Sequence, residues 1–139
     1  MVEAKVTKEI AASGTDVFGV LCVFDGIKPG GPIEAVSYEG EGIGMLRNLS
    51  MGGGEVIERL DLLDEDSLTM TYSIINDDSP LPFSNYSATV KISDNGDGSC
   101  RVDWTGTFDP KGESESAINT ATGIYAGAIK GAKIQLGVG

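Results

Sequence analysis

The chain alternates apolar and polar residues through most of its length and changes to a helical spacing only near its C-terminus. Residues 2–11 predict a first strand, and Ser13-Gly14-Thr15-Asp16 caps a short apolar helix over 17–24. Apolar residues recur every three or four positions from 113 to 136, which predicts one long helix. Six further strands are predicted at 33–39, 43–51, 54–63, 67–76, 84–94 and 99–108. This order predicts an α+β fold in which antiparallel strands wrap around the final helix.

An acidic turn joins two of the predicted strands, and the inward faces of these strands carry a carboxylate and a phenol. Alternation places Glu58 among apolar neighbours on one strand and Tyr72 on the matching face of the next. Pairing Leu62 with Leu68 across the turn predicts that Glu58 lies directly opposite Tyr72. A charge on an otherwise apolar strand face indicates either a wrong register or the lining of a polar cavity.

A second hairpin adds an arginine to the same region. Gly52-Gly53 forms the predicted tip of this hairpin, so Arg47 pairs with Glu58. Arg47, Glu58 and Tyr72 then lie side by side on three neighbouring strands, and Tyr86 shares their face. Because burying an ion pair costs desolvation free energy, the pair either contacts a polar ligand or satisfies itself near the open edge of the sheet.

The long helix is rich in small residues. Gly, Ala, Ser and Thr make up more than half of the residues from 114 to 133. A stripe of such residues facing a curved sheet either leaves an apolar cavity for a ligand or allows the helix and sheet to approach closely. The stripe consists of Ala117, Ala121, Ala128 and Gly131.

The orientation of the only tryptophan has two interpretations. Apolar alternation with Cys100 and Val102 turns Trp104 inward, where it forms an aromatic wall. The alternative turns Asp103 and Thr105 inward, and a β-bulge near Gly106 would reconcile the two.

Composition narrows the class of protein. With 139 residues the chain can bury one core, which predicts a single domain over 1–139. The net charge of −11 argues against nucleic acid and membrane as partners. No apolar run could span a membrane and the start has no signal-peptide pattern, so we expect a cytoplasmic protein whose Cys22 and Cys100 are buried reduced thiols. The absence of histidine removes the usual general base and the commonest transition-metal ligand, and we expect no metal and no cofactor.

Several strings of residues resemble the START-like or Bet v 1-like (SRPBCC) superfamily and are most similar to its polyketide cyclase/dehydrase branch. The resemblance covers nearly the whole chain and implies a helix-grip fold, with a seven-stranded antiparallel sheet curled around the C-terminal helix. Members usually carry a Trp-containing second short helix before the second strand, whereas this chain has Ile27-Lys28-Pro29-Gly30-Gly31-Pro32, which implies a shorter or more open entrance. The strings are Lys8-Glu9-Ile10-Ala11-Ala12, Asp16-Val17-Phe18, Gly42-Ile43-Gly44-Met45-Leu46-Arg47, Glu58-Arg59-Leu60-Asp61, Pro80-Leu81-Pro82, Asn85-Tyr86, Val102-Asp103-Trp104 and Phe108-Asp109-Pro110.

The resemblance and the predicted cavity together allow three functions. In the first, the protein binds a small hydrophobic or aromatic ligand, polyketide-like or steroid-like, and catalyses its cyclisation or dehydration. Glu58 is then the base or proton relay, Tyr72 or Tyr86 the proton donor and Arg47 the anchor for a carbonyl or enolate. In the second the protein is a non-catalytic carrier or sensor, and in the third a protein-interaction module similar to co-chaperones. We expect a monomer or homodimer. The predicted ligand contacts are Leu49, Met51, Val56, Ile74, Leu81, Phe83, Tyr86, Trp104, Ala121, Tyr125 and Ala128.

Overall fold

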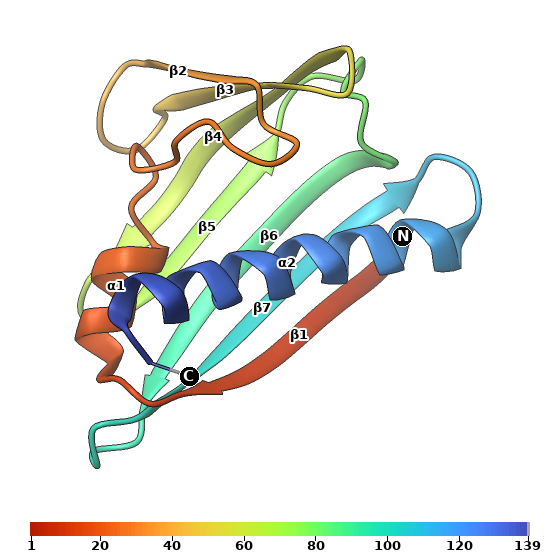
Figure 1. The fold of residues 1–139 in the computed structure, drawn as a ribbon. Coiled ribbons are helices and arrows are strands. Elements are labelled where there is room, and N and C mark those ends of the chain that lie inside the picture. Colours follow the sequence, from red (N-terminus) through yellow and green to blue (C-terminus); the bar gives the residue numbers. More distant parts are fainter. Residues whose placement is uncertain (139) are drawn as a thin grey trace.

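The seven strands form one antiparallel sheet, and this sheet curls around a long helix. A computed structural model describes residues 1–138. The strand order is β1-β7-β6-β5-β4-β3-β2, and helix α2 lies across the inner face of the sheet (Figure 1). The predicted helix-grip fold is therefore confirmed. The elements are β1 (Val2–Ile10), α1 (Gly14–Leu21), β2 (Ala35–Glu39), β3 (Leu46–Met51), β4 (Gly54–Asp64), β5 (Thr69–Ile74), β6 (Phe83–Asp94), β7 (Cys100–Pro110) and α2 (Ser114–Leu136).

The predicted strand boundaries are correct to within three residues, and glycine explains the largest difference. Strand β3 begins at Leu46, three residues later than predicted. The preceding Gly40, Gly42 and Gly44 all have positive φ angles, between 68° and 92°, so this segment is a run of turns. The strand can start only after the chain has left that region.

The long helix packs on the sheet, and α1 lies beside its C-terminal half and also contacts β6 and β7 (Figure 1). Ala121 is fully buried against the sheet. Ala128 is only half-buried and Gly131 is exposed, so the predicted stripe of buried small residues holds for its first half only. At 3.6 residues per turn, Gly131 lies about 80° around the helix from Ala121. The buried residues of α2 are Ala117, Ala121, Tyr125, Ile129 and Ala132.

The register of β4 with β5 differs from the prediction. Leu60, not Glu58, pairs with Tyr72, and Glu58 pairs with Ile74. Leu68 adopts a left-handed backbone conformation (φ 52°) and belongs to the acidic turn, so the pairs next to the turn are offset from the prediction by three residues, and a bulge between Leu60 and Leu62 reduces this offset to two. Glu58 and Tyr72 are therefore diagonal neighbours, and both remain on the inner face because the offset near them is two residues.

Trp104 faces the inside of the grip, as apolar alternation predicts. It is 6% exposed, and the neighbouring inward positions Val102 and Phe108 are fully buried. Asp103 lies on the outer face, where it accepts a hydrogen bond from Thr7. The irregularity in this part of the sheet lies on β6, between Ser84 and Ser87, rather than near Gly106.

Candidate functional site

The β3–β4 hairpin places a buried ion pair on the inner face of the sheet. Gly52 and Gly53 form a two-residue turn, and both have the positive φ angles that such a turn requires. This turn sets Arg47 opposite Glu58, as predicted. Glu58 Oε1 accepts from Arg47 Nε at 2.8 Å and lies 2.7 Å from Nη2. The two side chains are only 7% and 9% exposed, so the pair is shielded from water.

Arg47 also holds the segment that follows α1. Its Nη1 donates to the backbone carbonyl of Phe24 at 3.0 Å, and its guanidinium lies 4.1 Å from the centre of the Phe24 ring. Tyr38 on β2 donates to the carbonyl of Ile27 at 2.8 Å, which anchors the same segment a second time. These two side chains therefore hold the loop between α1 and β2 against strands β2 and β3.

A chain of three tyrosine hydroxyls runs from the sheet to α2. Tyr72 Oη lies 3.1 Å from Tyr86 Oη, and Tyr86 Oη lies 2.5 Å from Tyr125 Oη. Burial is the main cause that raises the pKa of all three hydroxyls, that of Tyr125 to about 12. All three are thus protonated at neutral pH, and each can donate one hydrogen bond.

Trp104 on β7 packs against two tyrosines of this chain. Trp104 stacks on Tyr125 with the ring centres 4.9 Å apart, and it meets Tyr72 edge-on at 6.4 Å. Gly106 lies directly beneath the hydroxyl of Tyr125, where any side chain would collide with the oxygen. The absence of a side chain at Gly106 thus allows Tyr125 to reach Tyr86.

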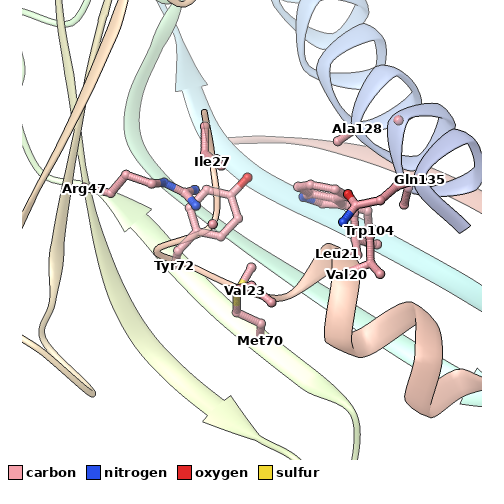
Figure 2. Close-up of a pocket in the computed structure, with 13 residues that line it drawn as sticks. Val20, Leu21, Val23, Ile27, Arg47, Met70, Tyr72, Trp104, Ala128 and Gln135 are labelled. Atoms are coloured by element: carbon pink, nitrogen blue, oxygen red, sulfur yellow. The ribbon is translucent and has the colours of Figure 1, made fainter. Parts of the chain in front are cut away.

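A cavity of about 270 Å³ opens between α1, the C-terminal half of α2 and the sheet. In Figure 2, Arg47 and Tyr72 lie on one side of it and Trp104 and Gln135 on the other. Most of its wall is apolar, and the polar groups gather at these side chains. The lining residues are Val20, Leu21, Val23, Gly26, Ile27, Arg47, Met70, Tyr72, Trp104, Ala128, Gly131, Ala132 and Gln135.

Comparison with known proteins identifies the family. Residues 1–135 match the family described as "Polyketide cyclase / dehydrase and lipid transport". The chain belongs to this family. The resemblance to the START-like and Bet v 1-like superfamily is thereby confirmed.

Individual proteins are similar to this chain over most of its length. The Dau c 1 isoallergen Dau c 1.0401 of Daucus carota subsp. sativus is 31% identical over 126 residues, which are 81% of this chain and 78% of the allergen. The structure of the protein XoxI from Bacillus cereus has a TM-score of 0.82 and 29% identity, and covers 97% of this chain and 95% of its own. Truncated norcoclaurine synthase from Thalictrum flavum shares the fold, with a TM-score of 0.78 at 21% identity over 97% of this chain and 93% of its own.

In this member of the polyketide cyclase/dehydrase and lipid transport family, the α1–β2 loop forms part of the cavity wall. Helix α1 ends at Leu21, three residues earlier than predicted, and the segment from 22 to 34 contains no helix, which agrees with the loop expected at Ile27–Pro32. Instead, Phe24 is buried at 3% exposure against Arg47, and Gly26 and Ile27 form part of the cavity wall. The sequence analysis missed these loop residues because an irregular segment has no periodicity that shows which side chains turn inward.

Four of the predicted site residues line the cavity, namely Arg47, Tyr72, Trp104 and Ala128. Glu58 lies behind Arg47 and is not part of the wall. Six others are buried in the core (Leu49, Val56, Phe83, Tyr86, Ala121 and Tyr125), and three are half-buried away from the wall (Met51, Ile74 and Leu81). Stacked aromatic rings fill the space around several of these core residues, and the ring centres of Phe83 and Tyr86 lie 5.0 Å apart. The roles of these residues as ligand contacts stay predictions.

The remaining features bear on chemistry away from the cavity. Cys22 and Cys100 are buried free thiols, as predicted, and burial raises the pKa of Cys22 to about 12. The turn at 94–98 joins β6 to β7, and its aspartates accept hydrogen bonds from turn amides such as Gly96. Within residues 1–138, no helix is both long enough and apolar enough to cross a membrane.

Proposed function

We propose that this protein binds a small, mostly apolar ligand in the cavity between α1, α2 and the sheet. The observation that carries the proposal is the wall itself, where apolar side chains surround a few converging polar groups from Arg47, Tyr72 and Trp104. Such a composition is typical of sites for small molecules. Membership of a family described by cyclisation, dehydration and lipid transport supports the same function.

The size of the cavity restricts the ligand. Ligand pockets usually measure about 300–1,000 Å³, whereas this cavity measures about 270 Å³. A molecule of two or three fused rings suits it better than a four-ring steroid.

Binding without catalysis is the function that we favour. Glu58, the predicted base, is engaged by two nitrogens of Arg47 through one oxygen and lies outside the cavity wall. A catalytic function is a second candidate, since Tyr72 lines the cavity and its hydroxyl is linked through Tyr86 to Tyr125. Such a chain could carry a proton to a ligand. An interaction module, the third function considered, would not respond to small apolar ligands.

A dye titration with two matched variants tests the binding function. The neutral naphthalene dye Prodan should gain fluorescence with the native protein, and the A128F variant should bind it at least about tenfold more weakly, because the new ring would occupy space in the cavity that the dye needs. The G127F variant places the same ring on the exposed face of α2, where an added Cβ meets nothing within 4 Å, and should bind like the wild type. Equal binding by both variants would place the dye elsewhere.

The Y72F variant separates binding from catalysis. It should keep Prodan affinity and the fold, since it removes one hydroxyl from the wall and leaves the ring in place. Loss of turnover of an offered polyketide substrate with unchanged binding would support an enzyme. Binding with no turnover in the wild type would support a carrier or sensor.

A further inference from the structure

The cavity wall contains a hydrogen-bond donor that has no acceptor. The indole Nε1 of Trp104 is fully buried, and no acceptor among residues 1–138 lies within hydrogen-bond distance of it. Trp104 as a whole is 6% exposed and lines the cavity (Figure 2). Buried N–H groups in proteins are nearly always paired, because leaving one unpaired costs the whole desolvation free energy of the group. Because the N–H itself has almost no exposed area, an oxygen atom brought by a ligand would satisfy it once the indole ring shifts slightly toward the cavity.

The charges around the cavity favour a neutral ligand. Arg47 is the only cationic side chain in the described wall, and Glu58 neutralises it at 2.7 Å. The tyrosines behind the wall are protonated at neutral pH, so they add no charge. The chain as a whole carries a net charge of −11, which repels anions. A carboxylate or phosphate would therefore lose its hydration without gaining a free counter-charge.

The tyrosine chain can adapt to such a ligand. Its three hydroxyls have three protons but form two hydrogen bonds, so one proton is left at one end of the chain. When the chain runs from Tyr125 through Tyr86 to Tyr72, the spare proton lies on Tyr72, in the cavity wall. The wall thus offers one fixed donor at Trp104 and one reversible donor at Tyr72.

We propose that the ligand is a flat, neutral, apolar molecule with a carbonyl-type oxygen, and that Trp104 Nε1–H donates a hydrogen bond to this oxygen. The inference rests on the proposed function, since it names the class of ligand for the same cavity. It adds a specific requirement: two ligands of the same shape, with and without the oxygen, are distinguished by a single N–H group. The apolar wall formed by Met70, Ala128 and Ala132 holds the rings, and the indole selects the oxygen.

The test compares 9-fluorenone, which carries a carbonyl oxygen, with fluorene, which has the same three rings and none. The ¹⁵N-labelled wild-type protein gives a single indole N–H resonance, because Trp104 is the only tryptophan. Fluorenone should move this resonance downfield and fluorene should not. In competition with Prodan, fluorenone should bind about tenfold more tightly than fluorene, because one hydrogen bond to a buried donor raises the binding affinity by about a factor of ten.

Two variants and a charged probe complete the design. The W104F variant keeps an aromatic ring but has no N–H, so the two affinities should become equal within about threefold. The M70L variant changes the shape of the wall without touching a donor, so it should change both affinities together and keep their ratio. 9-Fluorenone-2-carboxylate should bind more weakly than fluorenone, and tighter binding of the carboxylate would refute the neutral class.

The outcomes separate this inference from the proposed function. Equal binding of fluorene and fluorenone to the wild type, with an unmoved indole resonance, would overturn the inference and leave the binding function standing. Failure of Prodan and both ring systems to bind would overturn both. Should W104F fail to fold, the wild-type indole resonance decides the question by itself.

Discussion

The E58Q substitution is expected to lower the free energy of unfolding by about 3–5 kcal/mol. It removes the only carboxylate beside the guanidinium of Arg47, whose side chain is 7% exposed. The amide oxygen of glutamine can still accept a hydrogen bond, but the arginine charge is then uncompensated. The carbonyl of Phe24 supplies a dipole at 3.0 Å and no counter-charge. A loss of this size is a large share of the free energy of unfolding of a typical domain, which is about 5–15 kcal/mol.

A salt bridge on the opposite face of β4 gives the matched control. Arg59 and Asp61 are joined at 2.7 Å, the same distance as the buried pair, but the Arg59 side chain is 49% exposed. The D61N variant should therefore lose less than about 1 kcal/mol. The double variant R47M/E58L should lose less than E58Q alone, because it leaves no buried charge.

Equilibrium unfolding in urea at neutral pH, without ligand, measures all three variants. With a urea dependence of about 1–3 kcal/mol per molar, a loss of 3 kcal/mol moves the midpoint by roughly 1–3 M. The reasoning is refuted if E58Q loses no more than D61N. It is also refuted if R47M/E58L is less stable than E58Q, because that would mean the pair itself, and not the orphaned charge, supplies the stability.

Two further predictions concern other parts of the fold. The G106A variant should lose about 1–3 kcal/mol because its new methyl group collides with the Tyr125 hydroxyl; thermal unfolding should show that most of this loss disappears in a Y125F background, and an undiminished loss would assign it elsewhere. Hydrogen bonds from Gly96 and Gly14 lower the pKa of Asp94 below its usual 3.8, so the stability that they confer is present above about pH 4 and is lost as the pH falls through the lowered pKa. Urea unfolding between about pH 2 and 7 should show D94N less stable than the wild type at neutral pH and the gap closing in acid, whereas a gap independent of pH would contradict this account.

The hairpin registers show what the sequence can determine. The Gly52-Gly53 turn is a two-residue loop, so the pairing of Arg47 with Glu58 follows from turn length and alternation together. The acidic turn before β5 does not fix the register in this way, because Leu68 adopts a left-handed conformation that leucine rarely adopts and that the sequence therefore does not predict. Alternation could not detect the error near Glu58, since an offset of two residues leaves every side chain on its original face.

The candidate site was only partly predictable for a related reason. Regular elements supplied Arg47, Tyr72, Trp104 and Ala128, whose faces follow from periodicity. The remaining wall comes largely from α1 and the loop after it. Phe24 could have been suspected from one signal, namely that a buried arginine has five N–H donors and needs partners beyond a single carboxylate. The sequence does not show which loop carbonyl supplies that partner.

The buried ion pair is best understood through the loop that it holds. A buried pair of this kind is often no more stabilising than two well-packed apolar side chains, so stability alone gives little reason for Arg47 and Glu58 to occupy the core. The ion pair also orients the guanidinium of Arg47. Its Nη1 then donates to the carbonyl of Phe24, and its plane lies over the Phe24 ring. This contact holds the start of a loop whose Gly26 and Ile27 form part of the cavity wall. Arg47 therefore has two structural roles, since it lines the cavity and fixes this loop, and Glu58 holds Arg47 in place through the ion pair.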